Sequence, residues 1–129
     1  MIQSTAQVTV RYAETDMMGI VYHANYLKYF ERGRTEMVNE SGKTIDQWNA
    51  EGFVFVVFRM EITFHKPGKL NDKLRVVTTE VPGKSRYRLV LDQRLYRGDE
   101  ELCEAMVTLV CLDAKMELRE MPKLPKTEP

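Results

Sequence analysis

The stretch ETDMMGIVYHANYLKYFERGRTE, residues 14–36, begins as a polar loop broken by a glycine and continues as an aromatic-rich pattern of helical period. From Tyr22 onward, apolar residues recur at offsets of three and four, while charged residues occupy the opposite side. This pattern predicts one amphipathic helix of about eighteen residues, ~27 Å long. Its apolar stripe consists of Tyr22, Tyr26, Tyr29, Phe30, Gly33 and Met37.

The segments around this helix indicate where it begins, ends and packs. QVTVRY, residues 7–12, alternates polar and apolar residues and predicts a strand before the loop. Gly42 predicts the end of the helix, and TIDQWNAEG, residues 44–52, a short turn or helix. Gly33 lies on the apolar stripe, where the missing side chain lets another backbone approach closely. We therefore expect the helix to lie tightly against a sheet.

After Gly52 the sequence predicts four strands joined by short turns, which force antiparallel neighbours. The first of them has an apolar residue at every even position from 54 to 64, so we expect it to be buried on one face throughout and on both faces at its start. The result is an α+β fold with about five strands, whose sheet edges a homo-oligomer could cover. The four strands are FVFVVFRMEITF (53–64), KLRVVTTEV (73–81), SRYRLVLDQRLYR (85–97) and ELCEAMVTLVCLD (101–113).

Length and charge limit the class of protein. A chain of 129 residues with 43% hydrophobic content predicts one domain over residues 1–129. Three prolines in residues 122–129 predict a flexible tail there. Nineteen basic and nineteen acidic residues cancel, which argues against nucleic-acid binding. The N-terminus lacks a signal sequence, and no apolar run approaches the ~18 residues of a membrane span, so a cytoplasmic protein is expected.

The sequence also argues against metals, disulfides and nucleotide cofactors. Cys103 and Cys111 fall on one predicted strand, ~26 Å apart, so we expect two buried thiols. His23 and His65 are the sole histidines and form no metal-ligand spacing, so no metal is expected. No two glycines lie closer than nine residues, which excludes the Gly-rich loops for dinucleotides and phosphates, and G-x-S-x-G is absent.

The loop before the long helix remains as the candidate for chemistry. A helix start offers unpaired N–H groups and a partial positive charge, which would polarise a carbonyl oxygen. If the loop brings Asp16 to the same point, a carboxylate and an activating amide face one reacting group, as acyl transfer requires. His23 could add a hydrogen-bond donor or position a water. The alternative is that Asp16 caps a turn and His23 is a surface residue.

RYAETDMMGIVYHANYLKYFERGRTEM, residues 11–37, resembles the signature R-x-x-x-x-D-x-x-G-[IV]-[VF]-[YF]-x-x-x-[YF] of the 4-hydroxybenzoyl-CoA thioesterase family. The similarity is greatest to its broad acyl-CoA thioesterase branch, which includes Tol-Pal-associated thioesterases and in which histidine follows the tyrosine. It continues through VFVVFRMEITFHKPGKLNDKLRVVT, residues 54–78, and the closing MPK. The resemblance implies a hotdog fold, a long central helix wrapped by an antiparallel sheet.

The resemblance also implies an activity and an assembly. It implies hydrolysis of an acyl-CoA thioester to a free acid and CoA, at sites between the subunits of a homodimer or homotetramer. Acyl carrier protein is a second possible carrier of the acyl group. No cofactor is expected, because CoA is part of the substrate.

The resemblance assigns roles within the loop. Asp16 is implied as the catalytic carboxylate, either base or nucleophile, and the backbone amide near His23 as the group that polarises the thioester. Met17 and Met18 occupy positions where small residues or proline are common in the family. This difference leaves the shape of the acyl pocket open. Substrate contacts are expected from four further residues of this stretch: Gly19, Tyr22, Asn25 and Tyr26.

A second candidate segment is PGKSRYRL, residues 82–89. Its cations and the Ser85 hydroxyl could meet phosphate oxygens. In the resembled family a basic segment near this hairpin contacts the CoA nucleotide, so Lys84, Ser85 and Arg86 are expected to bind CoA. The alternative is a solvated strand face.

Other functions remain open at this point. A non-catalytic protein that binds acyl-CoA or acyl carrier protein, or acts as a scaffold, would keep the fold without needing Asp16. A hotdog dehydratase would carry H-[FP]-x-x-x-P-x-x-P-G or a paired Asp and His motif, and neither occurs. Glu31 and Glu36 fall on the polar side of the helix and are expected to be surface residues. His65 is expected at a strand end without a catalytic task.

Overall fold

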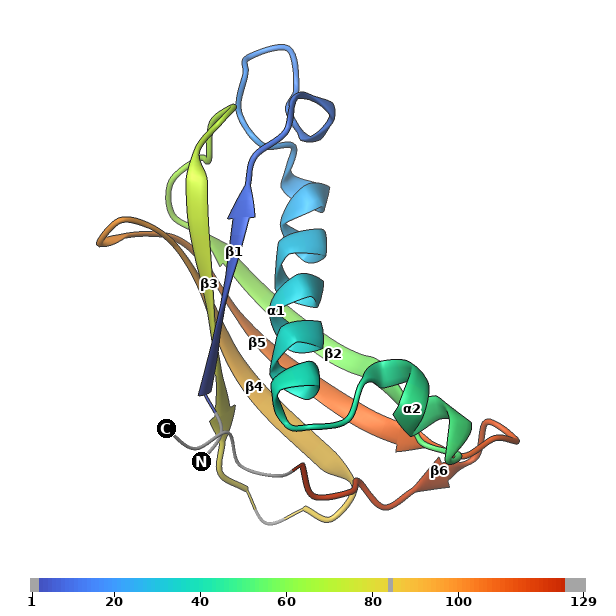
Figure 1. Ribbon diagram of the computed structural model, residues 1–129. Helices are drawn as coiled ribbons and strands as arrows, with labels where there is room; N and C mark the ends of the chain where they lie inside the picture. Colours follow the sequence, from blue (N-terminus) through green and yellow to red (C-terminus); the bar gives the residue numbers. More distant parts are fainter. Residues whose placement is uncertain (1–2, 84, 125–129) are drawn as a thin grey trace.

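A computed structural model of the protein describes residues 3–83 and 85–124 (Figure 1). One long helix and a six-stranded antiparallel sheet make up most of it. In chain order, the elements are β1 (Gln3–Thr9), η1 (Tyr12–Glu14), η2 (His23–Asn25), α1 (Tyr26–Glu40), α2 (Ile45–Ala50), β2 (Val54–Phe64), β3 (Lys73–Val81), β4 (Arg88–Arg97), β5 (Glu100–Leu112) and β6 (Leu118–Arg119), where η1 and η2 are short 3-10 helices.

The sheet has the strand order β1-β3-β4-β5-β2, with β6 pairing on β5. Every pairing is antiparallel. Figure 1 shows the sheet curving around α1, which lies along its concave face. The expected α+β hotdog arrangement, a long helix wrapped by an antiparallel sheet, is confirmed.

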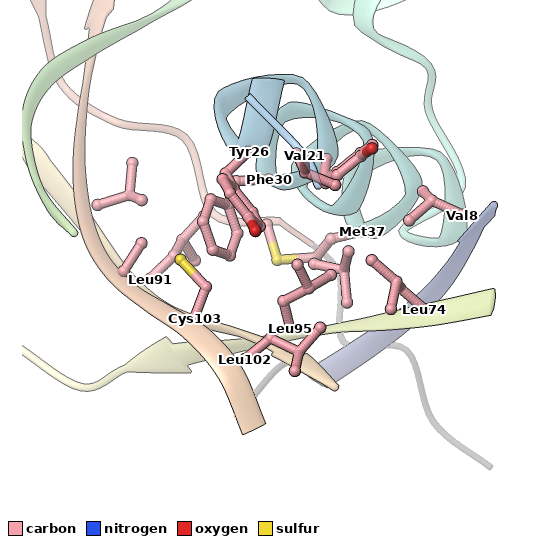
Figure 2. Packing of buried hydrophobic residues seen from close by; sticks show 14 of the residues in the cluster. Val8, Val21, Tyr26, Phe30, Met37, Leu74, Leu91, Leu95, Leu102 and Cys103 are labelled. Atoms are coloured by element: carbon pink, nitrogen blue, oxygen red, sulfur yellow. The ribbon is translucent and has the colours of Figure 1, made fainter. Parts of the chain in front are cut away.

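The core forms where the apolar stripe of α1 meets the concave face. Phe30 and Met37 are fully buried, and Figure 2 shows them among side chains of β4 and β5 such as Leu91 and Cys103. At Gly33 an added Cβ would lie 2.6 Å from Val76 Cγ1, closer than real contacts allow. The expected close approach of helix and sheet at this glycine is therefore confirmed.

A buried polar side chain fixes the helix against the sheet. Gln93 on β4 is fully buried, and its Nε2 donates to Phe30 O of α1 at 2.8 Å and to Thr78 Oγ1 at 2.9 Å. Its Oε1 accepts from Arg34 Nη1 at 3.0 Å. Buried amides that are fully bonded in this way specify one position for the helix, because any shift leaves a polar group unpaired.

Several boundaries differ from the sequence prediction. The first strand is Gln3–Thr9 instead of residues 7–12, because Val10 bonds to the β2–β3 turn and Tyr12 starts a 3-10 helix. The long helix starts with the 3-10 turn His23–Asn25, so Tyr22 precedes it and is half-exposed. β4 starts at Arg88 instead of residue 85, and β6 was not predicted.

β2 differs most from its prediction. None of its residues is buried, and Val57, Phe58 and Phe64 are exposed. The prediction was wrong because, among the described residues, β2 is an edge strand that pairs only with β5. A bulge between Val57 and Arg59 also breaks its alternation.

β5, in the interior of the sheet, carries both cysteines, which are buried and unpaired as predicted. Burial raises the pKa of the Cys103 thiol to about 12, so this thiol is protonated at neutral pH.

The C-terminal segment lies partly outside the described residues. Leu124, within the predicted tail 122–129, packs against the core, and residues 125–129 are not described. Within residues 3–83 and 85–124, neither helix combines the length and apolar character that a membrane crossing requires.

Candidate functional site

The loop between β1 and α1 folds into a small hairpin that carries Asp16. Thr15 and Val21 form an antiparallel bridge, and Asp16 N donates to Ile20 O at 2.9 Å. The tip is closed by Gly19, whose N–H donates to Asp16 O at 3.0 Å and whose φ of +76° lies in the left-handed region. Glycine adopts this conformation without steric cost, so its place in the loop has a local structural reason.

The Asp16 side chain is exposed, and its Oδ1 accepts a hydrogen bond from Met18 N at 2.8 Å. This is the turn-capping arrangement considered as the alternative from sequence. The bond uses one of the two carboxylate oxygens, so capping and proton acceptance are compatible. His23 is also exposed, and the centroid of its ring lies 4.5 Å from that of the preceding Tyr22.

Backbone hydrogen bonds join this loop to the turn between β2 and β3. Leu70 N donates to Gly19 O at 3.1 Å, and Val21 N donates to Gly68 O at 2.8 Å. Ile20 and Lys69 form a further antiparallel bridge. Two loops distant in sequence therefore hold one another at the N-terminal end of α1 (Figure 1).

The helix start presents two candidate amides. Tyr22 N donates to Glu14 O at 2.9 Å, and Asn25 N donates to Tyr22 O at 2.8 Å. Between them, His23 and Ala24 are the first residues of the helical segment, where no carbonyl of a preceding turn accepts their N–H groups. These two amides are the ones available to polarise a substrate carbonyl.

Glu14 is a residue of this site that sequence reasoning missed. Its Oε1 accepts from Tyr29 Oη at 2.8 Å and from Arg11 N at 2.9 Å. Its carbonyl oxygen accepts from Asn25 Nδ2 at 2.9 Å, in addition to the bond from Tyr22 N. The available signal was Tyr29 itself, because a tyrosine on the apolar stripe of a buried helix needs an acceptor for its hydroxyl.

The four predicted substrate-binding residues occupy different environments. Tyr26 is 3% exposed and its hydroxyl accepts from Gly68 N at 3.0 Å, while burial raises its pKa. Asn25 bonds to Glu14, Gly19 closes the hairpin, and Tyr22 is half-exposed next to His23. Asn25 thus holds the Asp16 loop and Tyr26 holds the β2–β3 turn, and substrate contact by any of the four stays a prediction.

The predicted CoA segment lies beside a cavity of about 700 Å³. The cavity opens between the C-terminal half of α1, the β3–β4 hairpin, β4 and the segment Glu120–Leu124. Ser85, Arg86, Arg88 and Lys123 contribute polar and cationic groups to its lining, and Met37 and Leu91 contribute apolar ones. Lys84 lies outside the described residues.

Arg86 is already paired within the chain. Its Nη1 lies 3.2 Å from Glu120 Oε1, and both side chains are mostly exposed. Met121 N donates to Arg86 O at 2.8 Å, which fastens the C-terminal segment beside the hairpin. The Ser85 hydroxyl accepts from Tyr87 N at 3.1 Å. A phosphate that binds Arg86 must therefore compete with an internal carboxylate.

Comparison with known proteins identifies the family. Residues 18–104, about two-thirds of the chain, match the thioesterase superfamily. The chain belongs to the thioesterase superfamily. The matched range includes His23 and begins two residues after Asp16.

Individual relatives agree with this assignment. The thioesterase is 38% identical over 118 residues to the acyl-CoA thioester hydrolase YbgC of Escherichia coli O6:H1, covering 90% of this chain and 87% of that protein. A probable thioesterase from Bartonella henselae has a TM-score of 0.87 and 31% identity, over 93% of this chain and 99% of that one. A DHNA-CoA thioesterase from Staphylococcus aureus has a TM-score of 0.85 and 27% identity, over 93% and 81%.

Within the chain of this thioesterase, the two predicted parts of the site lie apart. The hairpin of Asp16 is at the N-terminal end of α1, and the Arg86 hairpin is at its C-terminal end (Figure 1). The fifteen residues of α1 span ~22 Å between them. Neither the larger cavity nor a smaller one on β3 and β4 is lined by Asp16 or His23.

Three further residues lie where the sequence placed them. Glu31 and Glu36 are exposed on α1. His65 directly follows β2, and its Nε2 lies 3.4 Å from Glu101 and 3.7 Å from Glu104.

The donor atoms of His65, Glu101 and Glu104 are close enough for a metal ion. Arg94 Nη1, however, lies 2.9 Å and 3.1 Å from the two carboxylates and supplies a cation there. The cluster is thus an ion-pair network, and the absence of a functional metal stays a prediction.

Proposed function

We propose that this protein is an acyl-CoA thioesterase that hydrolyses a thioester to a free acid and CoA. The observation that carries the proposal is the Asp16 hairpin set against a helix start, in a chain 38% identical to a named acyl-CoA thioester hydrolase. The same relative favours the broad acyl-CoA branch of the 4-hydroxybenzoyl-CoA thioesterase family.

In the proposed reaction, the N–H groups of His23 and Ala24 bind the thioester oxygen and stabilise the negative charge that develops on it. Asp16 accepts a proton from a water molecule while the water oxygen bonds to the carbonyl carbon. The carbon–sulfur bond then breaks, and the CoA sulfur takes up the proton. In the other route, an Asp16 oxygen attacks the carbonyl carbon, the carbon–sulfur bond breaks and CoA leaves as the thiolate. Water then hydrolyses the resulting anhydride to the free acid and the Asp16 carboxylate, and the released proton passes to the CoA sulfur.

The CoA nucleotide is proposed to bind at Lys84, Ser85 and Arg86. The cavity beside this segment supports the proposal, because its rim offers Arg86, Arg88 and Lys123 to phosphate oxygens. Its partly exposed apolar lining, which includes Leu89 and Met121, could hold uncharged parts of the ligand.

We further propose that the active site is shared between two subunits of a homodimer or homotetramer, the assemblies that the family resemblance implies. The ~22 Å that separate the two parts of the site within one chain support sharing, because a symmetry-related subunit can bring its hairpin to the other's loop. The exposed apolar residues of edge strand β2, Val57, Phe58 and Phe64, support a buried subunit interface.

Light scattering tests this assembly. A species of about twice or four times the 15.1 kDa chain mass is expected at micromolar concentration. A well-folded, active monomer would contradict the shared site.

A panel of acyl-CoA substrates, assayed for release of free thiol, tests the function. Turnover of at least one acyl-CoA is expected, and the same acyl groups on acyl carrier protein would show whether this carrier is also used. The second candidate function is non-catalytic binding of acyl-CoA. The turn-capping bond of Asp16 is compatible with it, because capping gives this residue a structural role that needs no catalysis. Binding of acyl-CoA without thiol release across the panel would favour it.

A further inference from the structure

The candidate active-site loop is bonded to a buried side chain of α1 through the contact between Glu14 and Tyr29. Tyr29 is 2% exposed and lies on the first turn of α1, on the face toward the core. Its hydroxyl donates to Glu14 Oε1 at 2.8 Å, and the loop supplies Glu14 two residues before Asp16. This side-chain hydrogen bond thus joins the loop to the buried face of the helix.

This hydrogen bond has a charged acceptor and a donor that stays protonated. A carboxylate acceptor strengthens a hydrogen bond roughly twofold over a neutral one. Burial, and next the bond to Glu14, raise the pKa of the Tyr29 phenol, so it remains a protonated donor at every pH at which the protein would work. Removing the acceptor leaves the buried Tyr29 hydroxyl without this partner, which costs free energy, whereas Glu14 Oε1 keeps its bond from Arg11 N if the hydroxyl is removed.

The other contacts of Glu14 reach both halves of the candidate site. On one side, its carboxylate also fixes the chain just before the hairpin, through Arg11 N at 2.9 Å. On the other side, its carbonyl oxygen holds Tyr22 N and Asn25 Nδ2, the residues that bracket His23 and Ala24. Glu14 is therefore bonded both to the chain before the Asp16 hairpin and to the residues on either side of the two helix-start amides.

We propose that Glu14, held by Tyr29, is a positioning residue that fixes the Asp16 carboxylate relative to the helix-start amides. The inference rests on the proposed function of that loop. Glu14 acts through the loop and does not touch the reacting atoms. A loss of the bond would let the hairpin shift against the helix, and a misplacement of about 1 Å can cost up to ~10²-fold in rate.

Three substitutions test this proposal in the full-length oligomer. Tyr29→Phe removes only the hydroxyl and leaves the ring in the core, and Glu14→Ala removes the acceptor. Both should lower kcat about tenfold or more, while the Kd for acyl-CoA changes less than about twofold, since the nucleotide contacts lie elsewhere. Glu14→Gln keeps an acceptor oxygen and should recover most of the lost kcat.

The double variant Glu14→Ala/Tyr29→Phe shows whether the two residues act together. Because both single changes break the same bond, the double variant should be no slower than the worse single variant. Independent, multiplying losses would mean that Tyr29 does not act through Glu14, which would overturn the proposal.

Ser41→Ala is the matched control. Ser41 is buried beyond the opposite end of α1, and its Oγ donates to Val38 O at 2.5 Å. The change removes one buried hydroxyl bond, so it should lower the melting temperature as Tyr29→Phe does and leave kcat unchanged. If Ser41→Ala and Tyr29→Phe lose kcat equally, the Glu14–Tyr29 bond stabilises the fold in general and does not position the catalytic loop.

A parallel Asp16→Asn variant separates this inference from the proposed function. If Asp16→Asn is inactive while Tyr29→Phe and Glu14→Ala turn over at the wild-type rate, the positioning role fails and the proposed function stands. If Asp16→Asn is fully active, the catalytic role of Asp16 fails, and the positioning role fails with it.

Discussion

The two ends of α1 are built from different interactions. At the N-terminal end, backbone bonds to the β2–β3 turn and the half-buried Tyr29–Glu14 contact hold the Asp16 hairpin. At the C-terminal end, an ion pair between Arg86 and Glu120, with side chains 74% and 57% exposed, lies beside the large cavity. The first set fixes atoms in place, whereas an exposed pair contributes at most ~1 kcal/mol and is screened by salt.

This difference suggests a division of work within the proposed thioesterase. Bond making depends on sub-ångström placement, which a network of buried hydrogen bonds provides. Holding a charged nucleotide tolerates looser geometry, because phosphate contacts act in the ground state and transition state alike. Changes at the Asp16 end should therefore affect kcat, and changes at the Arg86 end should affect KM.

Asp16→Asn, at the N-terminal end of α1, should have the largest effect on activity. Asparagine preserves the size of the side chain and its turn-capping oxygen, so folding should survive. It cannot accept a proton at neutral pH, and kcat should fall ~10²–10⁴-fold, while the helix-start amides leave a small residual rate. Steady-state kinetics and a direct measurement of acyl-CoA binding would check for a collapse of kcat with near-normal Kd. If the variant keeps more than about a tenth of wild-type kcat, Asp16 has only a turn-capping role. Glu31 and Glu36 would then be the next carboxylates to test.

Gly33→Ala acts between the two ends and should disturb both. The new Cβ would lie 2.6 Å from Val76 Cγ1 and 2.9 Å from both Gln93 Nε2 and Thr78 Oγ1. Such overpacking typically costs about 1–3 kcal/mol, and it outweighs the ~1 kcal/mol that alanine gains in helix propensity. Urea denaturation should show a lower free energy of unfolding, accompanied by changes in kcat and KM together. Wild-type stability would mean that the helix can move away from the sheet without loss.

Replacing both Lys84 and Arg86 by alanine should raise KM about tenfold with little change in kcat, because contacts to phosphate are lost equally in the ground and transition states. The KM of the unmodified enzyme should also rise with ionic strength, while kcat stays constant. Kinetics at two salt concentrations would measure both effects. An unchanged KM in the double variant would assign this segment to a solvated face.

Glu120→Gln should have the smallest effect, in the opposite direction. Without the competing carboxylate, Arg86 is available to phosphate, and KM should fall about two- to fivefold, as expected for an exposed ion pair. Glu117→Gln is the control, because it removes the same charge three residues earlier, at an exposed position outside the cavity lining. An equal fall in both variants would indicate a general effect of net charge.

Sequence patterns correctly predicted the elements in which one apolar face packs against the rest of the chain. The stripe of α1, the limits of β3 at Lys73 and Val81 and the close approach at Gly33 all follow from periodicity and side-chain size. β2 has an equally regular pattern, and its predicted burial was wrong, because periodicity shows which side is apolar and not whether another element covers it. An edge strand leaves part of that side to a partner or to solvent.

The candidate site shows the same limit. The Asp16 loop was located from the switch between loop and helix, and its family signature singled out Asp16 and His23. Glu14 was missed, because its importance comes from Tyr29, fifteen residues away, and nothing in the local pattern pairs them. The sequence likewise did not indicate that Arg86 would be paired with Glu120, since that contact depends on the path of the C-terminal segment.

By itself, the sequence determined the class of fold, the family and the segment where chemistry would be sought, because periodicity and local motifs are properties of neighbouring residues. Only the tertiary structure decided that Glu14 and Tyr29 join loop to helix and that the Asp16 and Arg86 segments lie at opposite ends of α1. These are relations between residues distant in the chain. They are fixed by the packing of the whole helix on the whole sheet, and no single stretch of sequence contains that information.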